Sequence, residues 1–445
     1  MEKNEVKILP PLSVAWHGGK GFLHFISSRT MVIEGCPPSD ATGFSVYFGS
    51  MQVPILLTDA DIVQKADRSF VTFRESSRDL EGILTLVRKE QHIELCLTTD
   101  VESEKRWTGF ENLNFIPRAL PEFDLADVSL EREFLQRKFS LPYLITGMTG
   151  GMSRGTEINR RLAMAASELN IPMGVGSQRI ALDDSKHAEQ FNLKRHSPNL
   201  FLIANVGISQ LSKGCAEDAL RAVDMIKADA LAVHINIIQE AVQPEGDRFI
   251  EGAYTRIAEV LKSLSVPLII KEVGSGMDPV TASELSRLGV KALDVGGSGG
   301  TSWGWIEGFR GASKLSRQLG HDFRNWGIPT ANAVAAIKCL NLPCEIIATG
   351  GMRGGIMAAK ALGLGASMVG FGLPLFKAAI ESEDEVIRVL RHWAESTKRV
   401  LWATNSRHCS DLEGKLTYGH PFEDQIMQYL ELQQGNSRKS QNERK

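Results

Sequence analysis

Residues 230–240 read ALAVHINIIQE, and this stretch decides the fold that we predict for the chain. Its first seven residues alternate as in a β-strand, with bulky apolar side chains on one face and two alanines, His234 and Asn236 on the other. Gln239 and Glu240 follow directly and add an amide and a carboxylate. Burying four polar groups together is costly unless they pair with one another or with a ligand. We therefore interpret this strand end as a functional site, in preference to a satisfied buried histidine.

Further short apolar runs alternate with amphipathic helical patterns on both sides of this strand. The helical patterns include Glu157–Leu169, Ala253–Leu264, Pro279–Leu288 and Ala331–Leu340. Eight strands that alternate with helices predict an α/β fold with a parallel (β/α)8 barrel, the TIM barrel. A doubly wound open sheet is the alternative, which we disfavour because polar or glycine-rich loops follow nearly every run. The eight runs are Pro142–Thr146, Ile171–Val175, Leu200–Ala204, Ala228–His234, Pro267–Glu272, Ala292–Val295, Glu345–Thr349 and Met368–Phe371.

Composition excludes several classes of protein. The chain has 445 residues, a net charge of −3 and 43% hydrophobic residues, which support a sizeable core and argue against nucleic acid as a partner. None of the six cysteines lies in a CxxC pair, so we expect reduced thiols in a cytoplasmic protein. The sequence shows neither a signal-peptide pattern at its start nor an apolar stretch of membrane-spanning length, and we expect no membrane association.

The chain is predicted to have three segments. Residues 1–85 form an N-terminal extension of unknown role, with alternating patterns at Phe22–Ser27 and Phe44–Phe48 but without a catalytic constellation. Residues 86–432 hold the barrel and its accessory helices. Residues 433–445 are polar, and we expect a disordered tail.

The loops after the last two strands are the usual phosphate site of this fold. The loop at 349–355 holds four glycines, which let backbone N–H groups approach an anion, and Arg353, which adds positive charge. A glycine-rich loop can simply be a tight turn, but its place in the barrel favours a phosphate ligand.

Other strand ends indicate a cofactor and a metal. Lys271, near the end of the fifth strand, is expected to face an anion or a cofactor rather than the rim, and beside a flavin it would stabilise the negative charge of the reduced ring. The loop Gly296–Thr301 permits close approach of a planar or phosphorylated ligand and holds no cysteine nucleophile. Glu240 is the leading metal ligand, because one carboxylate with diphosphate oxygens and water suits Mg²⁺.

Together these motifs resemble the type 2 isopentenyl-diphosphate isomerases, the FMN-dependent class. The resemblance extends from about Arg88 to about Glu381. The basic cluster that opens it would, taken alone, be interpreted as a solvated surface. The matching motifs are Arg88-Lys89-x-x-His92, Met148-Thr149-Gly150-Gly151, Gly176-Ser177-Gln178-Arg179, His234-x-Asn236-x-x-Gln239-Glu240, Gln243-Pro244-Glu245-Gly246-Asp247-Arg248, Lys271-Glu272-Val273-Gly274, Gly299-Gly300-Thr301-Ser302-Trp303, Trp326-Gly327-Ile328-Pro329-Thr330 and Gly350-Gly351-Met352-Arg353.

The resemblance implies a barrel that binds FMN and interconverts isopentenyl and dimethylallyl diphosphate in isoprenoid biosynthesis. FMN must be reduced, typically by NADPH, and Mg²⁺ is required. The reaction is a 1,3-proton shift without net redox change. The family also suggests a homo-oligomer, a tetramer or an octamer.

The resemblance also implies a role for each matching residue. Gln239 stands near the alkene, and because an amide alone is a poor acid or base we assign it positioning or proton relay. Glu240 holds Mg²⁺. The expected substrate contacts are Arg88, Lys89, His92, Ser177, Arg179, His234, Asn236 and Gln239. The expected FMN contacts are Met148, Thr149, Gly150, Ser177, Asn205, Lys271, Thr301, Gly350, Gly351, Arg353 and Gly372.

The chain departs from the family in two respects. Gly147 and Gly372 stand where the family usually has alanine, and we expect looser packing near the flavin rather than loss of binding. More than 80 residues precede Arg88, whereas the family's basic cluster normally lies near the amino terminus. A reading frame that truly starts near Arg88 is our first hypothesis, and a small accessory domain is the alternative.

Two other functions compete with this one. An FMN-dependent 2-hydroxy acid oxidase would need a histidine base and a nearby arginine after the sixth strand, where Thr301, Ser302 and Trp303 stand instead. A flavin-binding regulatory barrel without catalysis is the other, and the intact Gln239 and Glu240 argue against it.

Overall fold

The computed structural model divides into two compact units. The first contains Met1–Val101, Ile237–Arg248 and Trp303–Arg324, and the second contains the remaining residues to Lys445. The structure describes residues 12–16, 19–25, 30–34, 43–48, 51–56, 60–65, 68–73, 78–150, 153–211, 216–243, 246–248, 250–311 and 313–442.

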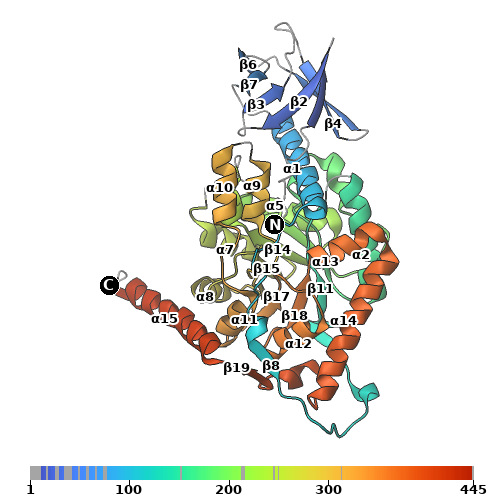
Figure 1. The fold of residues 1–445 in the computed structure, drawn as a ribbon, viewed down its shortest axis with the longest axis vertical. Helices are drawn as coiled ribbons and strands as arrows, with labels where there is room; N and C mark the ends of the chain where they lie inside the picture. Colours follow the sequence, from blue (N-terminus) through green and yellow to red (C-terminus); the bar gives the residue numbers. More distant parts are fainter. Residues whose placement is uncertain are drawn as a thin grey trace, which may run out of the picture. The chain divides into compact units, whose positions relative to one another are not determined.

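The second unit contains a closed barrel of eight parallel strands, which confirms the predicted (β/α)8 fold (Figure 1). Each predicted apolar run contributes one strand. The first strand pairs with the last, with Ile145 opposite Phe371, so the barrel has no open edge. The strands are β11 (Tyr143–Ile145), β12 (Met173–Gly174), β13 (Leu202–Gly207), β14 (Ala230–Ile235), β15 (Leu268–Glu272), β16 (Ala292–Asp294), β17 (Glu345–Ala348) and β18 (Met368–Phe371).

The barrel interior is filled with apolar side chains up to its amino-terminal end. Ala230 and Ala232 belong to this core, as the alternation in the sequence predicts. A hairpin of β9 (Arg132–Phe134) and β10 (Arg137–Phe139) adds two phenylalanines to the same core. The backbone N–H of Leu135 in this hairpin donates to Oε1 of Glu345 at the start of β17, at 2.8 Å. The amino-terminal end is therefore sealed, and the chemistry is left to the carboxyl ends of the strands.

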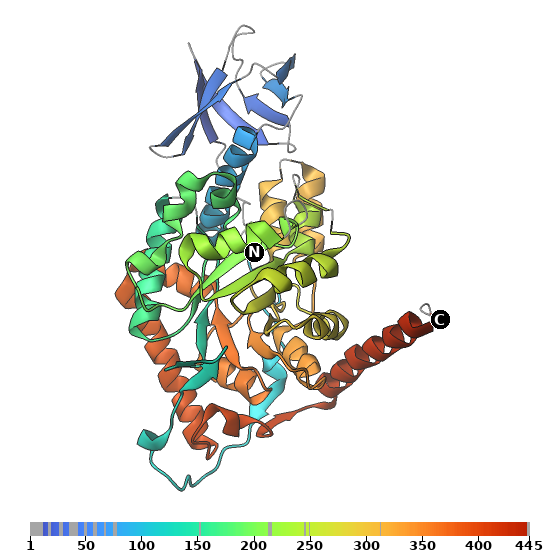
Figure 2. The same cartoon turned by 180° about the vertical axis from the view of Figure 1, so that it is seen from behind.

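Helices surround the strands, as Figures 1 and 2 show. They follow the βα order that the sequence predicts, and Tyr143 Oη lies 2.6 Å from Thr397 Oγ1, which ties β11 to α14. The described helices of this unit are α2 (Ser153–Glu168), α3 (Arg179–Asp183), α5 (Ala216–Ile226), α7 (Ala253–Ser263), α8 (Pro279–Leu288), α11 (Thr330–Lys338), α12 (Gly355–Gly363), α13 (Leu373–Glu381), α14 (Glu383–Ala403) and α15 (His420–Asn442).

The carboxyl end of the chain differs from the sequence-based prediction. We predict disorder from residue 433, but α15 continues as a helix to Asn442. Phe422 and Ile426 are buried, and Nδ2 of Asn332 on α11 donates to Gln425 Oε1 at 2.8 Å. Phe422 and Ile426 are four residues apart, so they lie on the same side of α15 and pack it against the barrel helices. Once this first part of the helix has formed, adding the polar turns that follow costs little.

Within the described residues, the first unit contains an antiparallel sheet and four helices. The sheet has seven strands in the order β5-β4-β1-β2-β3-β7-β6. Its strands β2 (Gly19–Phe25) and β4 (Gly43–Phe48) cover most of the two alternating patterns in the sequence. The other strands are β1 (Leu12–Trp16), β3 (Thr30–Glu34), β5 (Met51–Leu56), β6 (Ala60–Lys65) and β7 (Arg68–Phe73). The helices are α1 (Arg78–Thr98), α6 (Ile237–Val242), α9 (Trp303–Arg310) and α10 (Lys314–Asp322).

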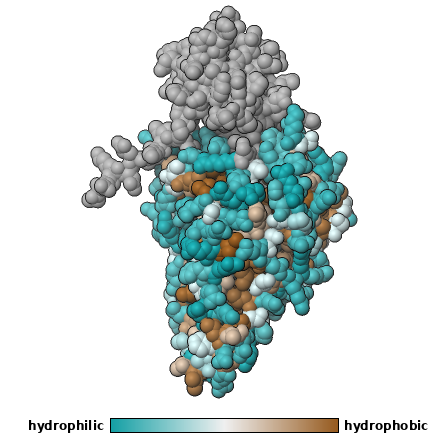
Figure 3. All heavy atoms as spheres, turned by 90° about the vertical axis from the view of Figure 1, so that its right-hand side faces the viewer, coloured by the Kyte–Doolittle hydropathy of each residue, from teal (hydrophilic) through white to brown (hydrophobic). Residues whose placement is uncertain are grey.

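Two further predictions concern the described residues. Cys339, Cys344 and Cys409 carry free thiols, as expected, whereas Cys36 and Cys215 lie outside the described residues. Among the described helices, none combines the length and the apolar character that crossing a membrane requires. On the face drawn in Figure 3, hydrophilic side chains predominate, with hydrophobic ones in smaller groups between them.

Candidate active site

A buried carboxylate, Glu307 on α9, is the centre of a polar cluster in the first unit. Its Oε1 lies 2.9 Å from His92 Nε2 on α1 and accepts a hydrogen bond of 2.9 Å from Gln239 Nε2 on α6. Its Oε2 accepts a short hydrogen bond from Arg310. Because Glu307 is completely buried, these neighbouring side chains must supply the hydrogen bonds that water gives to an exposed carboxylate. We call these four side chains the Glu307 cluster.

The Glu307 cluster fixes the protonation and the orientation of its members. Burial alone would raise the pKa of Glu307, but the Arg310 guanidinium and the His92 imidazole hold it well below its usual range. Burial lowers the pKa of His92, and two nearby guanidinium groups act in the same direction while Glu307 acts against them. A neutral His92 therefore donates through Nε2, and its Nδ1 carries a lone pair. An N–H of the Gln239 amide donates to Glu307, and this hydrogen bond fixes the orientation of the amide oxygen.

Basic residues of α1 adjoin this cluster. The Gln243 amide satisfies both neighbours when its nitrogen donates to Glu307 at 3.2 Å and its oxygen accepts from Arg88 Nη1 at 2.8 Å. Lys89 is half-buried, and burial, with the charge of Arg88 beside it, lowers the pKa of Lys89 to about 7. The predicted basic cluster thus includes a lysine whose charge changes near neutral pH.

Glu240, the predicted metal ligand, lies one residue beyond Gln239 on α6. Its Oε2 accepts the backbone N–H of Asp247 at 2.8 Å, which anchors the segment after the helix. Among the described residues, no group of three or more His, Cys, Asp or Glu side chains is placed to hold a metal ion.

In the second unit, His234 at the end of β14 is oriented by Asn205 on β13. Its Nδ1 lies 2.8 Å from Asn205 Oδ1, while Asn205 Nδ2 donates to the Val175 carbonyl at 2.9 Å. Because the amide nitrogen is already used, His234 must donate through Nδ1. The sequence predicts Asn205 as a flavin contact, and the structure adds that it fixes the tautomer of His234.

A cavity at the carboxyl half of the barrel has apolar walls and few polar groups. Lys271 on β15 and Asp294 on β16 both line it, and Lys271 Nζ lies 3.4 Å from Asp294 Oδ2. Asp294 is buried, with Oδ1 accepting from the Thr349 hydroxyl. The sequence-based prediction omitted Asp294. The other lining residues are Leu144, Thr146, Gly147, Gly174, Val175, Ile203, Ala204, Asn205, Ala232, Ile269 and Ile347.

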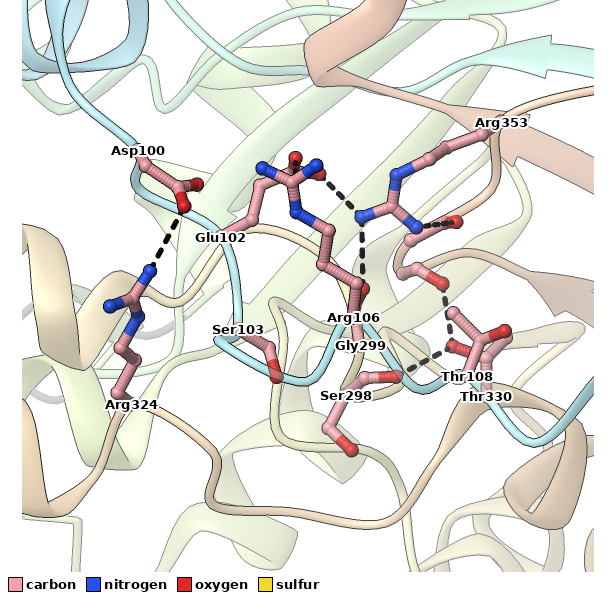
Figure 4. A network of polar contacts seen from close by, with 12 residues as sticks. Asp100, Glu102, Ser103, Arg106, Thr108, Ser298, Gly299, Arg324, Thr330 and Arg353 are labelled. Carbon is pink, nitrogen blue, oxygen red and sulfur yellow. Dashed lines mark hydrogen bonds and ion pairs between the residues drawn. The ribbon is translucent and has the colours of Figure 1, made fainter. Parts of the chain in front are cut away.

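The glycine-rich loops after β16 and β17 are fastened to each other by Thr330 and Arg353 (Figure 4). Thr330 Oγ1 donates to the Gly350 carbonyl at 2.6 Å. The Arg353 guanidinium donates to the carbonyls of Gly351 and Gly299 at 2.6 and 3.0 Å and forms an ion pair with Glu102. Arg353, predicted as a flavin contact, thus clamps these loops and the segment at Glu102.

The remaining predicted residues lie at other strand ends of the same unit. Gly350 lies in the loop after β17, and Thr301 pairs with Glu102 in an isolated bridge. Arg179 begins α3, with Nε 3.8 Å from Asp183 Oδ2. The structure also places Met148, Thr149 and Gly150 after β11, Ser177 after β12, Asn236 after β14, Gly351 after β17 and Gly372 after β18.

Gly147 differs from the expectation of loose packing. A Cβ at this position would lie 2.0 Å from the Val175 carbonyl oxygen, so the backbone of the next strand occupies the space of a methyl group. At Gly372 a Cβ would lie 3.1 Å from Thr146 Cγ2 and 3.2 Å from Met148 Sδ. Packing at Gly147 is therefore tight rather than loose, and only Gly372 borders side chains that could yield.

Two helices that follow the last two strands begin without a side-chain cap. Gly354 precedes α12 and Gly372 precedes α13, and neither helix start receives a hydrogen bond from a capping side chain. Asp278 and Ser382, in contrast, cap α8 and α14. In the first turn of α13, Pro374 has no N–H and the Leu375 N–H donates to the Gly372 carbonyl at 3.0 Å, so the start of α12 is the better place for a phosphate.

A family described as FMN-dependent dehydrogenase matches residues 236–418. The isopentenyl-diphosphate delta-isomerase of Pyrococcus horikoshii is 43% identical over 339 residues, which cover 74% of this chain and 91% of the relative. The proteins of the same name from Archaeoglobus fulgidus and Nostoc sp. are 41% and 39% identical, and each alignment covers 74% of this chain and 94% of the relative.

The chain belongs to the isopentenyl-diphosphate delta-isomerase family.

Solved structures show the same barrel outside the isopentenyl-diphosphate delta-isomerase family. A flavocytochrome b2 variant with sulfite bound matches with a TM-score of 0.54 at 15% identity, over 76% of this chain and 91% of its own. A mandelate oxidase variant with an FMN adduct matches with a TM-score of 0.50 at 17% identity, over 77% of this chain and 98% of its own. At this identity the likeness concerns the fold alone.

Two buried carboxylates of this isopentenyl-diphosphate delta-isomerase family member, Glu307 and Asp294, were not predicted from the sequence. Glu307 lies in the apolar and glycine-rich helix WGWIEGFR, where a lone carboxylate is a signal of a buried partner. Asp294 ends β16 one residue before the glycine loop, at a position that faces the lumen. Both are carboxylates in otherwise apolar segments, and that contrast could have indicated them.

Proposed function

We propose that this chain interconverts isopentenyl and dimethylallyl diphosphate by a 1,3-proton shift that requires reduced FMN, as a step of isoprenoid biosynthesis. Family membership supports the reaction. The observation that carries the proposal is the fixed orientation of Gln239 by the buried Glu307, at 2.9 Å. A precisely held amide beside a low-pKa carboxylate is a costly arrangement that a passive barrel does not need.

The residues of the barrel fit FMN. The cavity lined by Lys271 has the apolar walls that a flat ring needs and an ammonium and an amide for its polar edge. The uncapped start of α12 would hold the phosphate through backbone N–H groups. When bound and reduced, FMN supplies an electron-rich ring that takes part in acid–base chemistry. Lys271 would face that ring, while Arg353 would keep the phosphate loops in place.

On the family resemblance, we assign the diphosphate to basic and polar side chains from several parts of the sequence. Arg88, Lys89 and His92 on α1 would bind it, with Arg179 and Ser177 from the loop after β12 and His234 and Asn236 from the end of β14. A neutral His92 that donates Nε2–H to Glu307 offers an anion no second donor. We therefore expect His92 to take up a proton when the diphosphate binds.

Glu240 would hold Mg²⁺ through one carboxylate, with diphosphate oxygens and water as the other ligands. The metal would neutralise the charge of the diphosphate and orient it. The hydrogen bond from Asp247 to Oε2 keeps this carboxylate in one rotamer. Further parts of the proposal are NADPH as the reductant, a cytoplasmic location and a homo-oligomer, which follow from the family resemblance.

Gln239 would position the proton that moves. Its Nε2 donates to Glu307, so the orientation of the amide is fixed, and of its two polar atoms Oε1 is the one that can accept a hydrogen bond. Glu307 stays anionic because its pKa is low, and its part is to orient Gln239 and His92 rather than to exchange the proton.

The solved structures of similar fold belong to hydroxy-acid enzymes, which raises that activity as a second candidate. That activity would need a histidine and a nearby arginine in the loop directly after β16, where Thr301, Ser302 and Trp303 stand instead. The pair His321 and Arg324 lies further along, at and after the end of α10, and Arg324 forms an ion pair with Asp100. We therefore do not adopt it.

An anaerobic assay tests the proposed function. The purified full-length protein is incubated with FMN, NADPH, Mg²⁺ and isopentenyl diphosphate, and dimethylallyl diphosphate is measured. We expect product only when the flavin is reduced. A protein that binds FMN stoichiometrically and forms no product would contradict the reaction while leaving the cofactor assignment intact.

A further inference from the structure

Asp294 is a buried carboxylate that the proposed reaction does not use directly. It ends β16 opposite Lys271 of β15 in the strand register, and only 2% of its surface is exposed. Desolvating a carboxylate inside a barrel is costly unless charges and hydrogen bonds replace the lost water. Its surroundings therefore indicate what it does.

Three neighbours hold Asp294 in place. Its Oδ2 lies 3.4 Å from Lys271 Nζ, and its Oδ1 accepts from the Thr349 hydroxyl and, at 3.3 Å, from the backbone N–H of Gly296. Lys271 Nζ also donates to the Glu272 carbonyl at 3.1 Å. The carboxylate thus links β15, β17 and the loop after β16, and it fixes the lysine from one side.

Lys271 and Asp294 line the same cavity, where every other lining residue is uncharged. The wall therefore presents one positive and one negative charge at close range. An ammonium alone would stabilise the negative charge that a flavin gains on reduction, whereas a paired ammonium does so much less.

We propose that Asp294 is a positioning residue that aims Lys271 at the bound flavin and offsets its charge, thereby setting the flavin's reduction potential. This rests on the proposed function, because it requires FMN in the barrel. The balance of the two charges keeps the reduced ring from being held as a strongly stabilised anion, which suits a cofactor that must carry and return protons.

Charge-balance variants of the full-length, FMN-loaded protein test this. The bound flavin's midpoint potential and its dissociation constant are measured at pH 7. In Asp294→Asn the reduced form should gain at least tenfold in affinity over the oxidised form, a positive shift of about 30 mV for a two-electron couple. Lys271→Met should shift the ratio at least tenfold in the opposite direction. The double variant, which restores neutrality, should lie within about twofold of the parent protein.

A matched control changes a carboxylate to an amide elsewhere in the barrel. Glu345→Gln at the amino-terminal end of β17 should leave the potential unchanged, since this side chain serves the Leu135 N–H instead. An unshifted or more negative potential in Asp294→Asn overturns the proposal. If Asp294→Asn binds no FMN, the double variant is used instead. A midpoint potential of the double variant as low as that of Lys271→Met would also overturn the proposal. Failure of the parent protein to bind FMN would instead refute the proposed cofactor.

Discussion

At the scale of single residues, Glu307 shows how one side chain can hold a site together. Its carboxylate contacts His92, 215 residues away in the sequence, and accepts a hydrogen bond from Gln239, 68 residues away. Arg310 is nearly as buried and depends on the same carboxylate. Replacing Glu307 should therefore affect stability and activity for different reasons, which two variants can separate.

We expect Glu307→Gln to lower turnover by about 10²-fold, because Gln239 loses its fixed orientation. It should also destabilise the fold by roughly 3–5 kcal/mol, because the buried Arg310 loses its counter-ion. The double variant Glu307→Gln/Arg310→Met should regain stability in denaturant titrations but not turnover. Full turnover in the single variant would contradict the assigned role.

Lys89 gives the expected reaction a pH dependence. Its pKa is lowered to about 7 by burial and by Arg88, and only the ammonium form attracts a diphosphate. Above pH 7 the deprotonated Lys89 must take up a proton to bind the diphosphate, so it should add a rise of about tenfold per pH unit to the KM for isopentenyl diphosphate. Lys89→Arg should flatten the profile, because arginine stays charged. An identical profile in both proteins would assign the dependence to another group.

Gly147 and Gly372 form a matched pair for testing packing. Gly147→Ala should destabilise the protein by about 1–3 kcal/mol, because the Val175 carbonyl fills the space of the methyl group. Gly372→Ala should cost about 1 kcal/mol or less, because the flexible Met148 can yield. Thermal and urea unfolding of both variants compare them, and equal losses would show that the Val175 backbone moves freely.

At the scale of elements, the start of α12 offers a test of phosphate binding. Gly354 has an extended φ of 170°, and a Cβ there would meet nothing within 4 Å, so new side chains fit. Gly354→Asp would cap the helix but place a negative charge where the FMN phosphate should bind. We expect FMN affinity to fall at least about tenfold, measured by flavin fluorescence, while thermal stability is kept.

Gly354→Ser is the control for this change, because serine caps the helix without adding charge. Its FMN affinity should stay within about threefold of the parent value. Equal losses in the two variants would mean that any side chain at Gly354 blocks the site, and no loss in either would move the phosphate elsewhere.

The elements also show what the sequence alone allows. All eight barrel strands could be predicted, because short apolar runs that end in glycine or polar residues are a local signal. Glu307 could not be assigned its partners, because His92 and Gln239 become neighbours only when three helices pack. The role of Arg353 as a loop clamp depends equally on a distant carboxylate at Glu102. The helix beyond residue 433 is set by anchoring residues earlier in α15, so its polar composition misleads.

At the scale of the whole molecule, the curated relatives cover about three quarters of the chain, at 74% in each of the three cases compared. The seven-stranded sheet precedes α1 in the sequence, in the segment predicted as an N-terminal extension. Peptides spanning Gly21–Arg68 from the native protein would exclude the mistaken reading frame.

We expect a chain that begins at Arg78 to retain FMN and isomerase turnover, because all assigned site residues lie after that point. Bound flavin, turnover and unfolding midpoint are compared with those of the full-length protein. Loss of turnover with flavin still bound would give the sheet a part in the reaction, and loss of both would make it necessary for folding.

Closure of the barrel has a consequence for how the protein is made. Ile145 and Phe371 face each other in the completed sheet but are 226 residues apart in the chain. At about 5–20 residues per second, the ribosome needs roughly 11–45 s to deliver the second after the first. During that interval the edge of β11 that later pairs with β18 has unpaired backbone groups, which can pair with strands of other nascent chains. Codon choice and chaperone supply over this stretch should therefore govern the yield of protein without altering the stability of the finished barrel.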